Sequence, residues 1–393
     1  MNGTIYMPVG EVCSSISDTY REKKNMVTLI NTSDVLEGRV LNHEQVPNSN
    51  LKGQFKKTFQ RDDILYSEIR PQNRRFAYVD FSPIDYIAST KLMVIRAKKD
   101  VVSPKYLYYF LKNSSTVAEL QLLAETRSGT FPQITFSEVA NLTIPVPSLA
   151  VQEVIVQTMQ CLEDKITCNE QINDNLEQQA QSYFQELFVD NADPEWAIGT
   201  ISDLGTVVGG STPSKAKPEY YTESGIAWIT PKDLSINKSK FVSHGENDIT
   251  ELGLKNSSAA IMPEGTVLFS SRAPIGYIAI AAGEVTTNQG FKSVVPKPEI
   301  GTPFVYFFLK NTLPVIEGMA SGSTFKEVSG STMKNVPAVI PDAETLAKFS
   351  DFCAPIFAQQ RILEEQNQSL ATLRDNLLPK LMSGEIDVSA VQL

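Results

Sequence analysis

Basic side chains stand beside hydroxyl and amide side chains at several places in this sequence. Lysine and arginine neutralise phosphates, and Ser, Thr, Asn and Gln can hydrogen-bond to the edges of bases. Between Lys52 and Arg75 seven basic residues are opposed by only Asp62, Asp63 and Glu68. This combination of residue types indicates a nucleic-acid surface.

The candidate DNA contacts fall into one set for each half of the chain. In the first half they are Lys56, Lys57, Arg70, Arg74, Arg75, Lys91, Arg127 and Gln133. In the second half they are Thr212, Ser214, Lys215, Lys217, Lys232, Ser271, Arg272, Asn288, Gln289 and Lys326. Any one of them could equally be a solvated charge or a turn residue. Arg70 and Arg272, which follow equivalent predicted strands, are the strongest single candidates, although structural ion pairs would explain them equally well.

The overall charge argues against a free-standing DNA-binding protein. The 393 residues carry a net charge of −10, whereas phosphate binding depends on cations that displace counterions. Hydrophobic residues at 42% and charged residues at 20% are typical of a soluble protein with more than one domain. We find no apolar run long enough for a membrane span and no signal peptide, so we expect a cytoplasmic protein without membrane contact.

Catalytic, metal and cofactor motifs are absent from the sequence. The four cysteines form neither a CxxC pair nor a cluster with His43 or His244, so we expect no zinc site and no disulfide. There is no Walker loop, no strand-anchored GxGxxG and no His-Glu-x-x-His. The two histidines lack a nucleophile setting, and we expect them on the surface or in turns. We therefore predict no catalytic residue, no metal and no cofactor on this chain.

An internal repeat organises the chain. The segment Tyr106–Asn113 (YLYYFLKN) recurs as Phe304–Asn311 (FVYFFLKN), and Asn141–Pro147 recurs as Asn335–Pro341. The offset drifts in the front part of each half and is constant in the back part, as loop insertions before a rigid element would produce. Short strands joined by Gly, Pro, Ser and Asn turns, with helices around 106–123 and 303–319, predict a mixed α/β domain in each front part.

Each back part carries an apolar 4-3 spacing that predicts a long helix. The first seam is Ile155, Met159, Leu162, Ile166, Asn169, Asn173, Leu176, Ala180, Tyr183 and Leu187. Its repeat is Phe349, Cys353, Ile356, Gln360, Leu363, Asn367, Leu370, Arg374, Leu377 and Leu381. Each helix would extend about 55 Å at about 1.5 Å per residue. Two such helices most simply pack antiparallel, which would hold the domains apart.

Asn173 and Asn367 occupy equivalent positions in these seams. A buried Asn in a coiled coil fixes register and orientation at some cost in stability. We predict this role for both residues, because the apolar seam resumes on either side of each. The alternative is that either Asn faces solvent at a frayed point.

Several motifs resemble the specificity subunits of type I restriction-modification enzymes. They are Leu377–Ile386 (LLPKLMSGEI), Gly209–Lys215 (GGSTPSK), Gly225–Leu234 (GIAWITPKDL) and Gly265–Arg272 (GTVLFSSR). The resemblance covers almost the whole chain, and its signal comes from the motifs together. The first half departs from the pattern, since it has no counterpart of the Gly-Gly-Ser-Thr-Pro stretch.

The resemblance implies an α+β fold with an internal pseudo-two-fold repeat. It would consist of target-recognition domains at residues 1–148 and 191–341, with helices at 149–190 and 342–393 packed as an antiparallel coiled coil. Each domain would read one half of a split, asymmetric site in double-stranded DNA. The helices would bind two modification subunits, and restriction subunits would join the full complex. S-adenosylmethionine is expected on the modification subunit, because this chain lacks the Asn-Pro-Pro-Tyr and Asp-Pro-Pro-Tyr motifs of amino-methyltransferases.

The sequence is also consistent with other functions. A coiled-coil adaptor that binds only proteins would suit the acidic charge, and a degenerate subunit whose partners are lost has the same sequence features. A stand-alone nuclease or methyltransferase is opposed by the missing motifs. Neither the target sequence nor the spacer length follows from side-chain identity.

Overall fold

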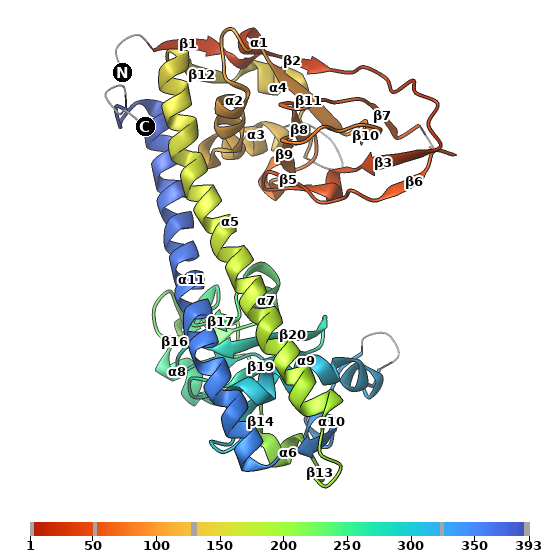
Figure 1. Ribbon diagram of the computed structural model, residues 1–393. Helices are drawn as coiled ribbons and strands as arrows, with labels where there is room; N and C mark the ends of the chain where they lie inside the picture. The colour runs from red at the N-terminus through yellow and green to blue at the C-terminus, as the bar shows by residue number, and fades with distance from the viewer. Residues whose placement is uncertain (1–3, 50–52, 127–131, 323–325, 389–393) are drawn as a thin grey trace. The chain divides into compact units, whose positions relative to one another are not determined.

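The computed structural model describes residues 4–49, 53–126, 132–322 and 326–388. The chain divides into two compact units (Figure 1). The first unit consists of residues 1–166 and 369–393, and the second of residues 167–368. Both of the long helices contribute one part to each unit.

In the first unit, a four-stranded sheet with the order β2-β11-β8-β9 lies at the centre of the domain, and a second sheet has the order β6-β3-β10-β7. The strands are β1 (Ile5–Pro8), β2 (Cys13–Ile16), β3 (Met26–Ile30), β4 (Val35–Leu36), β5 (Arg39–Val40), β6 (Gln45–Pro47), β7 (Phe55–Lys57), β8 (Ile64–Ser67), β9 (Phe76–Tyr78), β10 (Tyr86–Ser89), β11 (Leu92–Ala97) and β12 (Thr143–Val146). The helices are α1 (Val9–Val12), α2 (Pro104–Lys112), α3 (Ser114–Glu125), α4 (Phe136–Asn141), the start of α5 (Leu149–Gln185) and the end of α11 (Ala343–Ser383), with 3-10 turns at Thr32–Asp34 and Pro71–Asn73.

The second unit repeats this plan with a five-stranded sheet, β14-β22-β19-β20-β17, and a four-stranded sheet, β15-β18-β16-β21. Its strands are β13 (Ala197–Thr200), β14 (Gly205–Gly209), β15 (Tyr221–Thr222), β16 (Ile226–Ile229), β17 (Phe241–Val242), β18 (Asn247–Ile249), β19 (Val267–Ser271), β20 (Ile275–Ala281), β21 (Thr286–Thr287), β22 (Lys292–Pro296) and β23 (Pro337–Ile340). Its helices are α6 (Ile201–Leu204), α7 (Pro231–Ile236), α8 (Glu251–Lys255), α9 (Thr302–Gly318) and α10 (Gly330–Lys334), with a 3-10 turn at Pro218–Tyr220 and a π-helical turn at Glu186–Asp190.

The repeat seen in the sequence is a repeat of topology. In each unit the first strand pairs antiparallel with the strand that precedes a long helix, β1 with β12 before α5 and β13 with β23 before α11. In each unit the second sheet contains one parallel pair, β10 with β3 and β16 with β21. The mixed α/β domains predicted from the sequence are confirmed.

One predicted helix is divided in the structure. The stretch around 106–123 forms two helices, α2 and α3, because Asn113 has an extended ψ of 136° and ends α2. The Asn113 side chain then accepts a hydrogen bond from the backbone N–H of Ser115 at 3.4 Å, which caps α3. Its repeat, α9, is continuous, although Asn311 occupies the equivalent position.

The long helices form part of both cores. In the first unit Ile155 and Met159 of α5 are buried with Leu378 and Leu381 of α11. In the second unit the later part of α5 packs with the earlier part of α11, as the contact of Tyr183 with Phe349 and Phe352 shows at ring-centroid distances of 6.0 and 4.5 Å. Residue numbers therefore rise along one helix as they fall along the other, and within each unit the two helices are antiparallel.

The predicted seam residues Asn173 and Asn367 make different hydrogen bonds between the two helices. Asn367 accepts a hydrogen bond through Oδ1 from Nδ2 of Asn169 at 2.8 Å, and Asn169 is not its equivalent in the repeat. The backbone oxygen of Asn173 accepts from Nε2 of Gln360 at 3.2 Å. In an antiparallel pair, equivalent residues face non-equivalent neighbours, which the linear repeat does not reveal. Asn169 is fully buried.

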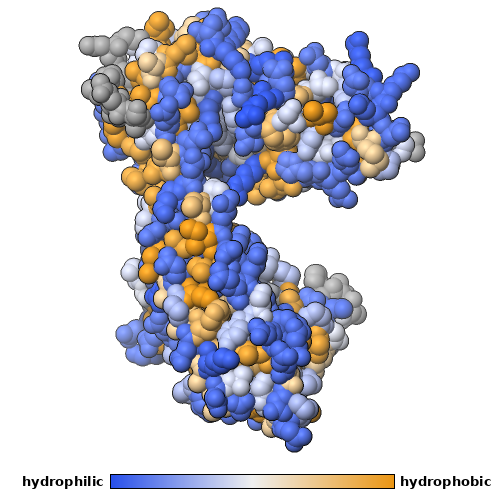
Figure 2. All heavy atoms as spheres, in the orientation of Figure 1, coloured by the Kyte–Doolittle hydropathy of each residue, from blue (hydrophilic) through white to orange (hydrophobic). Residues whose placement is uncertain are grey.

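The long helices also reach the surface. Figure 2 shows hydrophobic patches over these helices within a mainly hydrophilic face. Among their side chains, Ile172, Ile362 and Leu373 are 39%, 48% and 50% exposed. Over the described ranges of the chain, no helix has the length and apolar character that crossing a membrane requires.

Candidate nucleic-acid interface

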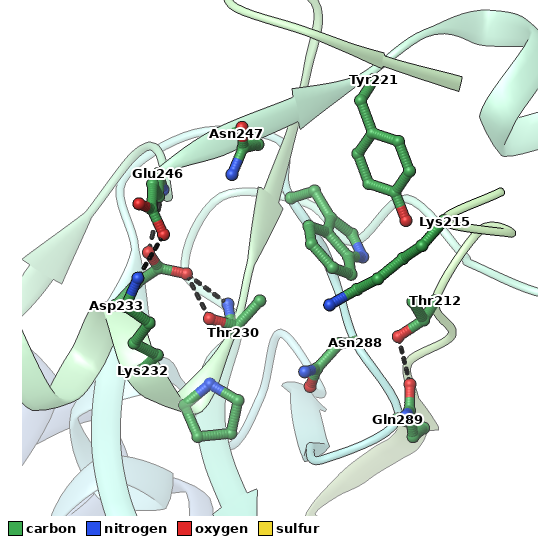
Figure 3. A pocket seen from close by; sticks show the side chains of 12 residues that line it. Thr212, Lys215, Tyr221, Thr230, Lys232, Asp233, Glu246, Asn247, Asn288 and Gln289 are labelled. Carbon is green, nitrogen blue, oxygen red and sulfur yellow. Dashed lines mark hydrogen bonds and ion pairs between the residues drawn. The ribbon is translucent and has the colours of Figure 1, made fainter. Parts of the chain in front are cut away.

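The second domain contains a pocket of about 580 Å³ lined by aromatic, amide and charged side chains. The loop after β14, the start of α7, the start of β18 and the turn before β22 contribute its walls (Figure 3). The lining residues are Thr212, Lys215, Tyr221, Trp228, Thr230, Pro231, Lys232, Asp233, Glu246, Asn247, Asn288 and Gln289. Tyr221 and Trp228 meet edge to face, with ring centroids 5.7 Å apart.

The Gly-Gly-Ser-Thr-Pro loop needs its second glycine to form this wall. A Cβ on Gly210 would lie 2.1 Å from the backbone oxygen of Asn288 and 2.3 Å from that of Thr287. The loop passes this close because Ser211 N–H donates to Thr287 O at 2.9 Å, while Trp228 Nε1 donates to Ser211 O at 3.0 Å. The glycine motif therefore fixes the loop that carries Thr212 and Lys215.

The acidic side chains of the pocket already have partners. Asp233 accepts hydrogen bonds from the N–H and hydroxyl of Thr230 at 2.7 and 2.6 Å, which caps α7. Its other oxygen accepts from the N–H of Glu246 at 2.9 Å. Lys232 forms an ion pair with Glu246 at 2.6 Å, and the carboxylate beside it raises the pKa of Lys232. These contacts reduce the repulsion that the acids would exert on a DNA phosphate.

The remaining groups suit recognition of base edges. Asn288 uses its amide oxygen to accept from Gly290 N–H at 2.8 Å, so its NH₂ group is the end that a ligand could use. The hydroxyl of Thr212 hydrogen-bonds to Oε1 of Gln289. Figure 3 shows Lys215 extending into the pocket. Amide and hydroxyl donors beside a cation provide the groups that read bases and hold the backbone.

Five residues predicted from the sequence line this pocket together: Thr212, Lys215, Lys232, Asn288 and Gln289. Ser214 and Lys217 are exposed on the same loop, and Lys217 lies over the ring of Tyr220 at 5.3 Å. The other seven lining residues were not among the sequence predictions: Tyr221, Trp228, Thr230, Pro231, Asp233, Glu246 and Asn247. The Trp228 motif was noted as a family signature, but its aromatic ring was not assigned to a site.

Three other predicted residues of this domain lie outside the pocket lining. Ser271 is fully buried, and its hydroxyl donates to Gly290 O at 3.1 Å, so it supports the turn behind the pocket instead of facing DNA. Arg272 pairs with Glu327 at 3.4 Å, the structural ion pair that the sequence left open. Lys326 is exposed.

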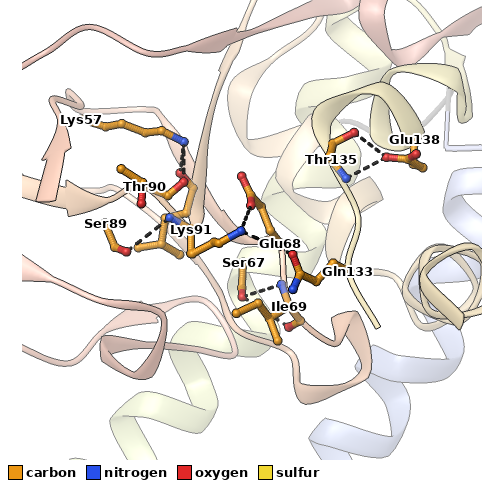
Figure 4. A network of polar contacts seen from close by, with 11 residues as sticks. Lys57, Ser67, Glu68, Ile69, Ser89, Thr90, Lys91, Gln133, Thr135 and Glu138 are labelled. Carbon is orange, nitrogen blue, oxygen red and sulfur yellow. Dashed lines mark hydrogen bonds and ion pairs between the residues drawn. The ribbon is translucent and has the colours of Figure 1, made fainter. Parts of the chain in front are cut away.

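In the first domain a polar network joins two of the predicted cations (Figure 4). Lys91 Nζ lies 3.3 Å from Oε2 of Glu68 and donates to Oε1 of Gln133 at 3.4 Å. Lys57 Nζ donates to the backbone oxygens of Thr90 and Leu92 at 3.1 and 2.8 Å. Burial lowers the pKa of Lys57. Lys57 therefore holds the β10–β11 turn, while Lys91 and Gln133 lie at the surface of the network.

The arginines of the first domain have unequal roles. Arg75 donates to Ser33 O at 2.9 Å, and Arg74 donates to Lys112 O at 3.3 Å and lies 3.5 Å from a carboxylate oxygen of Glu37. These contacts hold loops of the domain, and DNA contact by Arg74 and Arg75 stays a prediction. Lys56 and Arg70 are exposed, and Arg127 lies outside the described residues.

Within the described part of the chain, no group of three or more His, Cys, Asp or Glu side chains is arranged to hold a metal. His43 hydrogen-bonds to the hydroxyl of Tyr86 at 2.8 Å, and His244 lies 3.3 Å from Asp248.

Comparison with known proteins gives consistent matches. The family model described as "Type I restriction modification DNA specificity domain" matches residues 6–178 and 194–373. The HindI specificity subunit of a type I restriction enzyme from Haemophilus influenzae is 29% identical over 435 residues, covering 92% of this chain and 94% of that protein. The MjaIX specificity subunit from Methanocaldococcus jannaschii is 39% identical over 194 residues, 47% of this chain and 45% of that protein. A crystal structure of a type I system S subunit from M. genitalium shares the fold, with a TM-score of 0.56 at 17% identity and 97% coverage of both chains.

These matches define a DNA specificity protein built from two copies of one domain. Because the family model covers most of both halves, the chain belongs to the specificity subunits of type I restriction-modification systems, and it recognises DNA sequence.

Proposed function

We propose that the chain is a non-catalytic subunit that reads a bipartite, asymmetric site in double-stranded DNA, with one half-site for each domain. The pocket of the second domain carries this proposal, since it gathers Lys215, Asn288 and Gln289 beside two aromatic rings. The first domain presents a different surface, with Lys91 and Gln133 around Glu68. Two surfaces of different chemistry favour two different half-sites.

We assign methyl transfer and DNA cleavage to partner subunits. The sequence holds none of the nucleotide-binding, metalloprotease or amino-methyltransferase motifs that would support catalysis. We assign S-adenosylmethionine and methyl transfer to a modification subunit, and DNA cleavage to a restriction subunit. The relatives are named as subunits of type I restriction enzymes, which supports this division of labour.

Two modification subunits would bind one copy of this chain. The duplication supports this stoichiometry, because each repeat offers a similar set of elements to a partner. Exposed Ile172, Ile362 and Leu373 on the long helices are candidates for the contact surface. The cytoplasm, where host DNA lies, is the proposed location.

The experiment is methylome sequencing of a host that expresses this chain with its modification subunit, compared with a host that lacks only this chain. We expect a split, asymmetric adenine-methylated motif that depends on the chain. If a stable complex forms and no new motif appears, the proposed function is wrong and a protein adaptor becomes the better description.

A further inference from the structure

A buried ionic cluster in the second unit joins the domain to both long helices. At its centre is Glu177 of α5, whose carboxylate lies 2.5 Å from Nζ of Lys240 and 2.5 Å from Nζ of Lys310. The hydroxyl of Tyr306 donates to the same carboxylate at 3.1 Å. Nζ of Lys240 also donates to Oε1 of Gln360 on α11 at 2.7 Å. We call this group the Lys240 anchor.

Lys240 is held more completely than the rest of the cluster. Its side chain is 6% exposed, and its ammonium group lies 3.8 Å above the ring of Phe357. Its backbone is also fixed, since Glu364 of α11 accepts from the N–H of Lys240 at 2.7 Å and from the N–H of Phe241 at 3.0 Å. Side chain and main chain are therefore both attached to the long helices.

The segment that contains Lys240 forms one wall of the pocket. This segment, Pro231–Asn247, begins in α7 and ends at the start of β18. Its two ends carry Lys232 and Glu246 into the pocket lining, and Asp233 connects the ends by accepting from Glu246 N–H. The two ends of the segment are therefore joined by a hydrogen bond at the pocket, and its middle is bound to the long helices through Lys240.

The first domain has a charged attachment of the opposite sign one residue away from the backbone position that corresponds to Lys240. The N–H of Tyr78 donates to Gly38 O at 3.2 Å, just as the N–H of Ile280 donates to Lys240 O at 2.7 Å, which makes Gly38 the counterpart of Lys240 and places Glu37 one residue before it. Glu37 pairs with Arg74 at 3.5 Å, and its charge also interacts with that of Arg374 on α11. Both domains therefore have a charged side chain beside this parallel strand pairing, at non-equivalent positions and with opposite charge.

We propose that Lys240 is a positioning residue for DNA readout, which sets the place of the segment Pro231–Asn247 and so determines how selectively the second domain reads its half-site. This inference rests on the proposed function. A buried ion pair contributes little net stability compared with apolar packing, but it penalises alternative arrangements because an unpaired buried charge is costly. A buried ion pair of this kind therefore suits the segment Pro231–Asn247, if the position of the segment affects DNA readout more than its stability does.

The test uses the full chain in complex with its modification subunit. Lys240→Met removes the ammonium group and leaves Glu177 paired with Lys310. The matched control is Lys255→Met, which removes a lysine from the same domain whose side chain is 74% exposed and lies 3.5 Å from Glu251. Lys215→Ala, in the pocket, identifies which half of the methylated motif belongs to the second domain.

We expect Lys240→Met to relax that half of the motif, with about a tenfold loss of discrimination at one or more of its bases, about 1.4 kcal/mol at 25 °C. The other half should stay intact, and Lys255→Met should leave both halves unchanged. Lys240→Arg, which keeps the cation, should restore part of the discrimination, which a merely space-filling role would not require. An unchanged motif with Lys240→Met would overturn the inference.

A second readout does not depend on DNA recognition. Hydrogen exchange of the peptides that cover Pro231–Asn247 should accelerate at least about tenfold in Lys240→Met, because the attachment no longer opposes local opening. If exchange there is unchanged, the anchor does not position the segment. Absence of any motif with the wild-type chain would instead refute the proposed function. If Lys240→Met proves unstable, Glu177→Gln/Lys240→Met gives the same readouts. The double variant removes both the ammonium group of Lys240 and the carboxylate of Glu177, so neither of these two charges is left buried without the other.

Discussion

Asp233 holds the pocket of the second domain together. One carboxylate oxygen caps α7 through Thr230, and the other accepts from the N–H of Glu246, so a single side chain connects two of the walls. It is 9% exposed, and a Cβ on Gly245 would lie 2.9 Å from its Oδ2. Asp233 therefore contributes to the shape of the pocket as much as to its charge.

Asp233→Ala should destabilise the second unit by about 2–3 kcal/mol, because it removes a helix cap and leaves two backbone N–H groups without acceptors. The sequence contains two tryptophans, Trp196 and Trp228, and both lie in the second unit, so urea unfolding followed by tryptophan fluorescence measures this unit. Asp203→Ala, which removes the same type of cap from α6, is the control and should perturb the pocket less. Equal effects of the two changes on the spectrum of Trp228 would count against the role of Asp233.

Lys215→Ala should weaken DNA binding by the complex about tenfold at moderate salt. Loss of one phosphate contact should also lower the slope of log affinity against log salt by about 1. The comparison is a salt titration of the complex on its own methylated motif. Lys255→Ala removes the same charge from an exposed site outside the pocket and should change neither quantity. If both variants weaken binding equally, only long-range charge is involved.

Sequence reasoning found the cations of the pocket more readily than its shape. The residue types of Lys215, Asn288 and Gln289 signalled polar recognition, and these residues do lie together. Arg74 is also a cation and Ser271 also a hydrogen-bonding side chain, yet both donate hydrogen bonds to backbone oxygens of their own domain. Burial and a nearby backbone oxygen decide whether such a side chain lines the pocket or bonds within the domain. No local sequence pattern encodes either of them.

The long helices were the element most fully predicted. Their period, their antiparallel packing within each unit and the burial of seam residues such as Ile155 and Phe349 follow from the heptad spacing. The pairing of Asn367 with Asn169 did not follow, because the register of an antiparallel pair depends on how far one helix is displaced along the other. The Lys240 anchor was also missed, since its members come from four separate elements.

The Asn169–Asn367 pair can be tested as a register device. Asn367→Leu should destabilise the second unit by about 1–3 kcal/mol, because Asn169 is fully buried and would lose its shorter hydrogen bond, keeping only the 3.5 Å contact of Nδ2 with Oε1 of Gln366. Asn169→Leu/Asn367→Leu should regain that stability, since both polar groups are then gone. A double-mutant cycle in urea measures the coupling. Additive effects of the two single changes would show that the pair does not act as a unit.

Glu177 should make the stability of the second unit sensitive to acid. Burial favours the neutral carboxyl, but the ammonium groups of Lys240 and Lys310 outweigh it and hold the pKa of Glu177 below its ordinary value. A group with a lowered folded pKa contributes stability above its unfolded pKa of about 4.5 and loses it as the pH falls through the folded value.

Tryptophan-monitored unfolding between pH 6 and pH 3 should therefore show a steeper loss of stability in the wild type than in Glu177→Gln. Glu364 faces the same cluster, and burial raises the pKa of its carboxyl, so its protonation acts in the opposite direction. The difference between wild type and Glu177→Gln isolates Glu177. Parallel pH profiles would contradict the assignment of a paired, ionised Glu177.

For the whole molecule, the net negative charge opposes the binding of DNA. The chain carries a net charge of −10, although its candidate DNA surfaces present lysine and amide groups. The excess acids oppose the approach of a polyanion, and salt weakens both this repulsion and the local attraction. Duplication within one chain lets the two domains diverge and escape the palindrome that a two-fold homodimer must read.

The free chain should accordingly bind its own bipartite site poorly at physiological salt, and the complex with modification subunits should bind it at least about a hundredfold more tightly, because the partners add cationic contacts to the DNA backbone. Fluorescence anisotropy of a labelled duplex containing the methylated motif measures both affinities across a salt series. A duplex with one half-site scrambled is the control for sequence recognition. Tight, motif-dependent binding by the free chain would show that its local surfaces overcome the net charge without help, and the partners would then serve catalysis alone.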